Sequence, residues 1–447
     1  MDLGTLRRKE IIAPLRNGTV PRRGLEHLAV GLGRFEAAID EELEHVAHGY
    51  GAFKAVRGEY GSGKTFFSRW VQHRAQQRGF ATAEVQISAS ETPLHKLETI
   101  YRRALESLRT KEWDSGAFRA LVDRWFYGLE EEVNTRGGPR EPAALAEEVG
   151  DLLETRLTAV RDTQPLFATV LRACYRARVG EDNATADGLL AWLMGQPNVG
   201  ASVKRPAGLQ GDIDGTAAAG FLRGLLVLLR ETGRKGLLLV LDEVETIQRM
   251  RADVREQSLD ALRKLIDDID GERYPGLYVM ITGTPAFFEG PQGIKRLAPL
   301  EQRLYQDFSG DPRFDSARAT QIRLLPFDVE KLVEVGGKVR ALYPTKHPQR
   351  IAERVGDAVV RELAAALTGK LGGRVGVAPR LFLRKMVSDL LDKVDEHEEY
   401  DPRRDFKLVV DAREMTSAER EAAGLETTVD DIALDLPSQD GGERRSE

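Results

Sequence analysis

Residues 58–65 read Gly58-Glu59-Tyr60-Gly61-Ser62-Gly63-Lys64-Thr65 and match the pattern G-x-x-x-x-G-K-[ST] at every position. Glycines let such a backbone wrap around phosphates, Lys64 can then reach the β- and γ-phosphates, and the Thr65 hydroxyl can ligate Mg²⁺. An alternating stretch at 52–57 predicts a strand before the loop, and apolar residues at helical spacing in 67–75 predict a helix after it. The segment therefore predicts a loop that holds the phosphates of ATP. A glycine-rich loop that binds nothing is the alternative.

A second motif is Leu237-Leu238-Leu239-Val240-Leu241-Asp242-Glu243, an apolar run that ends in two acids. Such a run is typical of a strand buried on both faces of a parallel sheet. Ligands of these sheets sit at the carboxyl ends of the strands. We therefore expect Asp242 to face the Mg²⁺ held by Thr65, and Glu243 to act as general base on the attacking water. A strand that merely ends at a polar surface is the alternative.

The rest of the chain predicts an α/β fold: a parallel sheet of the P-loop NTPase type with a long helical insertion and a C-terminal helical lid. Further strands are expected at 83–88, 277–281 and 321–325. Between the second and third strands lie leucine-rich segments with helical spacing. Because loops of that length without secondary structure are rare, these segments predict a helical insertion. The predicted units are a basic N-terminal segment (1–30), a first part of the core (31–94), a helical insertion (95–230), a second part of the core (231–327), a helical lid (328–400) and an acidic tail (401–447).

Composition and charge limit the classes of protein that the sequence can encode. The 447 residues are too many for one ordinary domain, and no run of about 18 apolar residues predicts a membrane helix. A single cysteine, Cys174, excludes an internal disulfide and favours the reducing cytoplasm. Segment 426–447 carries −5 of the total charge of −6, so the remaining body carries only −1. That near-neutral body neither supports nor excludes nucleic-acid binding.

Several positions, taken in order, resemble the AAA+ ATPases, nearest to replication-initiator and transposition-type members. Ala29-Val30-Gly31 with Arg34 resembles the box that packs against adenine, and Gly283-Thr284-Pro285 stands where that family keeps a polar sensor. The resemblance implies Thr284 as the sensor (Thr282 in reserve), Arg303 as an arginine finger (Arg296 as its alternative) and Arg380 as a lid sensor. The nucleotide contacts so assigned are Val30, Gly31, Gly58, Glu59, Tyr60, Gly61, Ser62, Gly63, Lys64, Thr65 and Phe66. Nothing transfers to the helical insertion.

A narrower resemblance joins the N-terminal stretch 11–25 with Ala29-Val30-Gly31 and the segment 57–67. Together they are similar to the ATP-binding proteins of bacterial BREX phage-exclusion systems, in the family called BrxD. The resemblance implies a role in antiphage defence, in a DNA-associated complex beside other BREX proteins, with double-stranded DNA as a further partner. The loop and acidic motifs predict ATP and Mg²⁺ as cofactors, the arginine finger of the AAA+ resemblance implies a homo-oligomer, and the lack of a long apolar run predicts no membrane partner. The BREX resemblance supplies no substrate beyond ATP.

Other interpretations remain open at this point. The chain could be a nucleotide switch or scaffold that binds ATP without hydrolysis, although Glu243 argues against that. A STAND-type signalling NTPase would carry a repeat-rich sensor region, and a small-molecule kinase would need a base at an acceptor site; the sequence shows neither. The basic N-terminal segment could contact phosphates or could brace the ATPase core.

Overall fold

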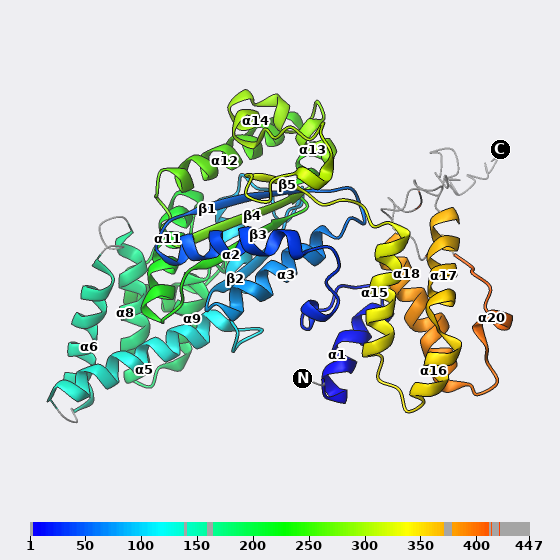
Figure 1. The fold of residues 1–447 in the computed structure, drawn as a ribbon. Helices are drawn as coiled ribbons and strands as arrows, with labels where there is room; N and C mark the ends of the chain where they lie inside the picture. Colours follow the sequence, from blue (N-terminus) through cyan, green and yellow to red (C-terminus); the bar gives the residue numbers. More distant parts are fainter. Residues whose placement is uncertain are drawn as a thin grey trace, which may run out of the picture.

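The structure is a computed structural model that describes residues 3–137, 141–158, 164–370 and 378–410, together with residues 413 and 420. The predicted acidic segment 426–447 lies outside the described residues. Three regions follow one another across the molecule in Figure 1: the outer helices of the insertion, the sheet with its covering helices, and a C-terminal helical body.

The core is a five-stranded sheet in which all paired strands are parallel, in the order β2-β3-β4-β1-β5. The strands are β1 (Ala52–Arg57), β2 (Ala81–Gln86), β3 (Leu237–Asp242), β4 (Leu277–Gly283) and β5 (Gln321–Arg323). This confirms the α/β fold with a parallel sheet. β2 lies two residues earlier than predicted, because it pairs with β3 from Ala81 opposite Leu237 to Gln86 opposite Asp242, where β3 ends.

Helices cover both faces of the sheet, as parallel sheets require. One face packs on α2 (Gly33–Ala47) and α3 (Lys64–Gln77) through side chains such as Leu238 and Met280. The other face packs on α12 (Ala252–Asp270) and on helices of the insertion through the alternate side chains, such as Leu239 and Val279. The central strands β3 and β4 are therefore mainly apolar, and polar groups collect where they end.

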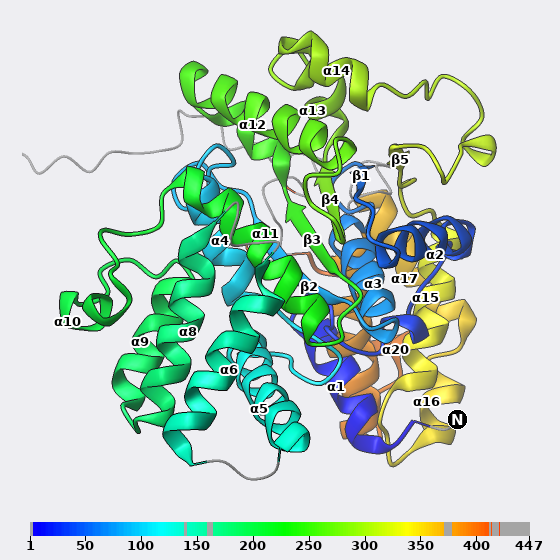
Figure 2. The same ribbon diagram turned by 90° about the vertical axis from the view of Figure 1, so that its left-hand side faces the viewer.

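The stretch between β2 and β3 is helical, as predicted. Its innermost helices, α4 (Leu97–Glu106) and α11 (Gly215–Glu231), pack against each other and join the core of the sheet. The others extend outward from them (Figures 1 and 2). They are α5 (Ala117–Gly137), α6 (Pro142–Arg156), α8 (Pro165–Val179), α9 (Asn183–Leu193), α10 (Ala201–Lys204) and η2 (Arg205–Ala207).

Short elements connect the last strands and lead into the C-terminal helices. After β3 come η3 (Val244–Arg249) and α12; after β4 come α13 (Pro285–Glu289), η4 (Ile294–Arg296), α14 (Ala298–Leu304) and η5 (Pro312–Phe314). The C-terminal helices are α15 (Val329–Leu342), α16 (Pro348–Arg354), α17 (Asp357–Lys370), α18 (Ala378–Lys385), the π-helical η7 (Met386–Leu391), α19 (Asp392–Glu396) and α20 (Pro402–Asp405).

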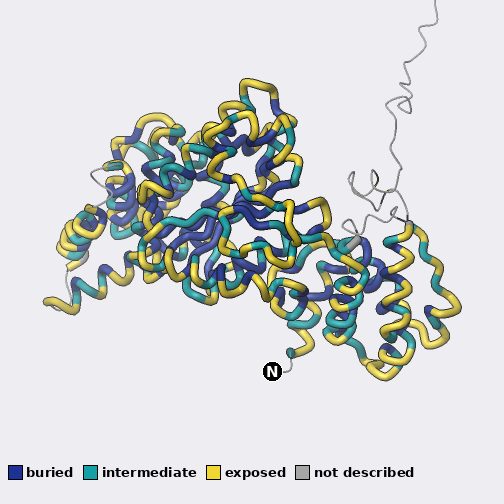
Figure 3. The backbone as a smooth tube through the Cα atoms, turned by 45° about the horizontal axis from the view of Figure 1, so that its top comes forward, coloured by how far each residue is buried: buried dark blue, intermediate teal, exposed yellow. Residues whose placement is uncertain are grey.

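The N-terminal helix α1 (Thr5–Arg16) belongs to the C-terminal helical body. Its buried residues Ile11, Ile12 and Leu15 share one apolar core with α15, α18 and η7. Arg16 forms a bidentate ion pair with Asp392, with nitrogen–oxygen distances of 2.6 and 2.8 Å. Figure 1 shows α1 beside α15, and Figure 3 shows buried residues inside this second body. The N-terminal segment therefore braces the C-terminal helices, an arrangement that the sequence did not predict.

A buried lysine ties the segment before β5 to the sheet. Lys54, on β1, is only 1% exposed, and its ammonium donates to the carbonyls of Ala319 (2.7 Å) and Ala317 (3.2 Å). Glu42 of α2 pairs with this ammonium and also accepts the hydroxyl of Tyr278 on β4. Burial raises the pKa of Glu42, while Lys54 opposes the shift. One charged cluster thus joins a helix, two strands and a loop.

Candidate functional site

The phosphate loop joins the end of β1 to the start of α3. Gly61 and Gly63 have φ of 76° and 89°, a left-handed conformation that glycine adopts without strain. Gly58 has no room for a side chain, because a β-carbon there would lie 2.2 Å from the Ser62 hydroxyl. Its N–H donates to the Gly283 carbonyl at 3.1 Å, which ties the loop to the end of β4. The glycines of the motif thus allow a tight turn that leads directly into a helix N-terminus.

Lys64 lies folded back under this loop. Its ammonium donates to the carbonyls of Gly58 (2.8 Å) and Glu59 (3.2 Å), and the residue is 9% exposed. Burial lowers the pKa of Lys64, and neighbouring carboxylates, Glu245 most strongly, oppose that shift. A cation held by neutral carbonyls at a helix N-terminus is suited to bind phosphate oxygens.

Asp242 ends β3 beside Thr65, and together they could hold a magnesium ion. The Thr65 hydroxyl lies 3.4 Å from Asp242 Oδ2, and the Thr282 hydroxyl of β4 donates to the other carboxylate oxygen. Asp242 is 6% exposed, and burial raises its pKa. A hydroxyl and a carboxylate are hard oxygen ligands of the kind that Mg²⁺ prefers. The residues present therefore fit that ion, which would screen the phosphate charge when bound.

Glu243 turns away from the strand that precedes it. Its backbone is left-handed, with φ of 60° and ψ of 44°, and its N–H donates to Thr282 Oγ1 at 3.2 Å. Its side chain is exposed and accepts a hydrogen bond of 2.8 Å from the Gln86 amide at the end of β2. A non-glycine residue in this conformation is uncommon and often marks a functional site. Gln86 was missed by sequence reasoning, because only strand pairing shows that β2 ends opposite Asp242.

A second acid, Glu245, was also missed. It lies on η3, is 7% exposed, and lines the same cavity as Lys64 and Asp242. Burial raises its pKa. The only sequence signal for Glu245 is the acidic stretch Asp-Glu-Val-Glu at 242–245, which by itself is equally consistent with the polar end of a strand.

These groups open into one cavity of about 280 Å³. Its walls come from four parts of the chain: the loop 60–66, the acids at 242–245, the N-terminal stretch from Leu15 to Leu32, and later residues that include Phe327 and Leu383. The loop and the acids make part of the wall polar, and the remainder is lined mainly by apolar side chains, as nucleotide and other small-molecule sites commonly are. The N-terminal segment and the C-terminal helices both contribute to this apolar part.

The structure brings many of the predicted site residues to this cavity. Its lining includes Val30, Tyr60, Gly61, Ser62, Gly63, Lys64, Thr65, Phe66, Asp242, Glu243 and Arg380. Gly58 and Glu59 face Lys64 through their carbonyls, and Gly31 lines a smaller adjacent cavity of about 180 Å³.

Two further predicted residues, Thr284 and Arg303, also lie outside this cavity lining. Thr284 precedes α13 and is 5% exposed, whereas Thr282, its reserve, contacts both Asp242 and the backbone of Glu243. Arg303, on α14, pairs with Asp267 of α12 and donates to the Pro299 carbonyl at 2.6 Å. Its alternative, Arg296, lies 3.3 Å from Glu256.

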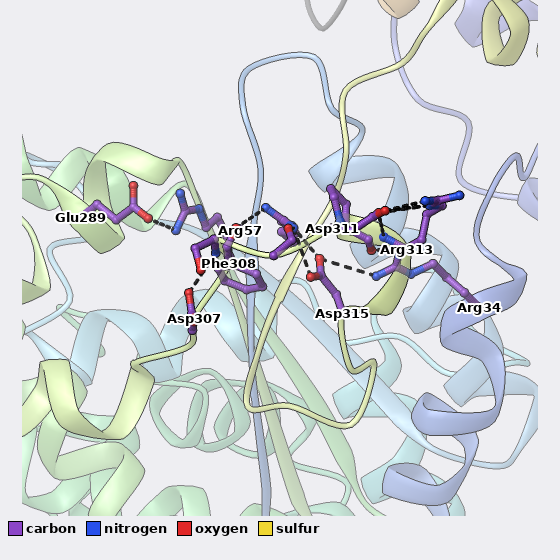
Figure 4. Close-up of polar contacts among 12 residues, drawn as sticks. Arg34, Arg57, Glu289, Asp307, Phe308, Asp311, Arg313 and Asp315 are labelled. Carbon is purple, nitrogen blue, oxygen red and sulfur yellow. Dashed lines mark hydrogen bonds and ion pairs between the residues drawn. The ribbon is translucent and has the colours of Figure 1, made fainter.

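A network of charged side chains fixes the loop before β5 against the carboxyl edge of the sheet (Figure 4). Arg57, the residue before the phosphate loop, pairs with Glu289 at 2.5 Å, and its guanidinium lies 5.3 Å from the centre of the Phe308 ring. Arg323 lies 5.0 Å from the same ring centre, so Phe308 contacts two cations. The network continues to Asp311, Arg313, Asp315 and Arg34. Arg34 therefore belongs to this support of the site.

A scan against models of protein families matches residues 4–410 to the family described as BREX system ATP-binding protein BrxC/D. The chain belongs to this family. The match includes the N-terminal helix, the sheet, the insertion and the C-terminal helices, so the BrxC/D chain is the ATP-binding component of a BREX antiphage system. A search of curated proteins finds no match. Within the described part of this BrxC/D family member, no helix is long and apolar enough to cross a membrane.

Proposed function

We propose that this BrxC/D family member is a Mg²⁺-dependent ATPase that hydrolyses the β–γ bond of ATP. The observation that carries the proposal is the convergence of Lys64, Thr65, Asp242 and Glu243 on one cavity. Two of them come from the start of α3 and two from the end of β3, nearly 180 residues apart in the chain. This set contains a cation for phosphate, oxygen ligands for a metal and a carboxylate for water, which together suit phosphoryl transfer.

Each residue has a distinct task in this proposal. The loop N–H groups and Lys64 bind and orient the phosphates, exchanging the carbonyls of Gly58 and Glu59 for phosphate oxygens. Thr65 and Asp242 hold Mg²⁺. The Glu243 carboxylate gives up its hydrogen bond to the Gln86 amide and then accepts a proton from the attacking water. The Gln86 contact gives that carboxylate a defined position at the end of β2.

The finer features implied by the resemblance belong to the same proposal. We infer an AAA+-like homo-oligomer in which Arg303 acts on the ATP of a neighbouring copy. Arg303 lies on α14 and does not line the cavity of its own chain. Arg380 lines the cavity and would act within one chain. Thr284 remains the proposed polar sensor, with Thr282 as the nearer alternative. A cytoplasmic complex with other BREX proteins and double-stranded DNA completes this proposal.

Phosphate release from MgATP tests the proposal against a switch that binds ATP without turnover. Purified protein should bind ATP and release phosphate steadily, and omission of Mg²⁺ should abolish release. ATP binding without release in excess of one phosphate per chain would instead support the switch. Release that persists in Lys64→Ala protein would indicate a contaminating enzyme.

A further inference from the structure

Glu245 is a buried carboxylate in the cavity for which the four-residue proposal above has no task. It is 7% exposed, and its Oε2 atom is buried without a hydrogen-bond partner among the described residues. Lys64 is the charge that acts on it most strongly, but that ammonium donates to two loop carbonyls. Buried carboxylate oxygens are normally hydrogen-bonded, so an orphaned one in a binding cavity needs an explanation.

The local backbone aims Glu245 into the cavity. Because Glu243 is left-handed, the chain turns sharply after β3 and enters η3. Val244 is then fully buried in the core of the sheet, while Glu245 reaches the cavity lining beside the loop. A continued strand would have alternated these residues between its two faces. The turn therefore brings a third acid to the site formed by Asp242 and Glu243.

The chemistry of a carboxylate limits what this orphaned oxygen can bind. An ionised carboxylate only accepts hydrogen bonds, and phosphate oxygens at neutral pH are acceptors too. Direct contact with the phosphates of ATP would thus be repulsive. Among the described lining residues, the proposal already assigns Lys64 and the loop N–H groups to the phosphates and Thr65 to the metal. The donor left for Glu245 is then water, either the attacking molecule or one bound to the metal. A carboxylate at the cavity wall is suited to orient a water molecule once its oxygen turns toward the cavity.

We propose that Glu245 is a second catalytic carboxylate, which turns its buried oxygen toward the cavity, accepts a hydrogen bond from the attacking water and aligns the oxygen of that water with the γ-phosphorus. This inference rests on the proposed ATP hydrolysis. In the step, the water oxygen forms a bond to the γ-phosphorus. The bond from that phosphorus to the β–γ bridging oxygen breaks, and its electron pair leaves with ADP. One water proton hydrogen-bonds to Glu245, and the other passes to Glu243.

The test compares Glu245→Gln with the parent and with Glu147→Gln, an exposed glutamate of α6 in the insertion. Turnover of MgATP by Glu245→Gln should fall roughly 10²-fold, because the amide is a weaker acceptor and can turn its N–H₂ toward water. Calorimetry should show ATP affinity within about threefold of the parent at saturating Mg²⁺, since no phosphate contact is lost. The melting temperature of the nucleotide-free variant should rise, because a buried charge without a partner is gone. The control variant should match the parent in all three.

Each contrary outcome identifies a different error. Parental turnover in Glu245→Gln would overturn the role of Glu245 while leaving ATP hydrolysis intact. A weakened dependence of ATP affinity on Mg²⁺ would make Glu245 a metal ligand and overturn the contact with water. A lowered melting temperature with parental turnover in the folded fraction would show a purely structural residue. If the parent itself releases no phosphate, the proposed ATP hydrolysis is refuted, and the proposed role of Glu245 is refuted with it. Should Glu245→Gln not fold, Glu245→Asp, which withdraws the oxygens by one methylene, carries the same comparison.

Discussion

Replacement of Lys64 by alanine tests whether the loop cation binds phosphate. In the structure Lys64 is 9% exposed, and its ammonium donates to the carbonyls of Gly58 and Glu59. When the β- and γ-phosphates enter, they replace neutral acceptors with anionic ones. Lys64→Ala removes the positive charge closest to the phosphates within the loop.

The size of the effect follows from the burial of Lys64. At an effective dielectric constant of about 20, unit charges about 4 Å apart attract by about 4 kcal/mol. Because Lys64 is already buried by protein atoms, little of that attraction is spent on removing water from the lysine. Some of it is offset by the loss of the two carbonyl contacts, each worth about 0.5–1.5 kcal/mol. A net loss of about 1–3 kcal/mol weakens ATP binding by roughly 5- to 150-fold.

Isothermal calorimetry with ATP and Mg²⁺ measures this change directly. Lys264→Ala, at an exposed position of α12, is the matched control and should bind like the parent. A melting curve should confirm that Lys64→Ala is folded. Folded Lys64→Ala protein with parental affinity would refute the assignment of the loop as the phosphate site.

Three further predictions concern the base, the buried lysine and the finger. Glu243→Gln should bind ATP normally and release phosphate roughly 10²-fold more slowly, as measured by calorimetry and phosphate release; parental turnover would exclude Glu243 as the base. Lys54→Met should lower the free energy of unfolding at pH 7.5 by about 2–3 kcal/mol in urea titrations, because it leaves the half-buried carboxylate of Glu42 without its cation. The folded pKa of Glu42 is raised, so this loss should shrink as the pH falls through that pKa, and a loss independent of pH would contradict the ion pair. Arg303→Ala and Lys64→Ala proteins, each slow alone, should regain ATPase activity when mixed; no regain, with specific activity independent of concentration, would exclude action on a neighbour.

The sheet could be predicted from sequence because its signals are local. The apolar run before Asp242 and the alternating stretch before Gly58 each specify a strand, and the loop motif specifies the turn and helix that follow. The motif residues then meet because parallel strands end at one edge. The two-residue shift of β2 reflects pairing with β3, a partner far away in the chain.

The remaining features depend on contacts between distant segments. Ile11 and Ile12 of α1 are apolar in sequence, but nothing there identifies the C-terminal helices as the surface that buries them. The role of Glu245 depends on the left-handed backbone of Glu243, a conformation that no residue pattern at 242–245 requires. The contact between Gln86 and Glu243 likewise exists only once β2 and β3 are paired.

The most direct test of the ATP site is an experimental structure with Mg²⁺ and a β,γ-imido analogue of ATP. The account predicts phosphates within hydrogen-bond distance of Lys64 and the loop N–H groups, and Mg²⁺ ligated by the Thr65 hydroxyl next to Asp242. We also expect the adenine ring to occupy the apolar part of the cavity, between the N-terminal segment and the C-terminal helices. Nucleotide bound elsewhere would contradict this assignment of the ATP site. So would a complex in which Lys64 still donates to the carbonyls of Gly58 and Glu59 and does not contact the phosphates.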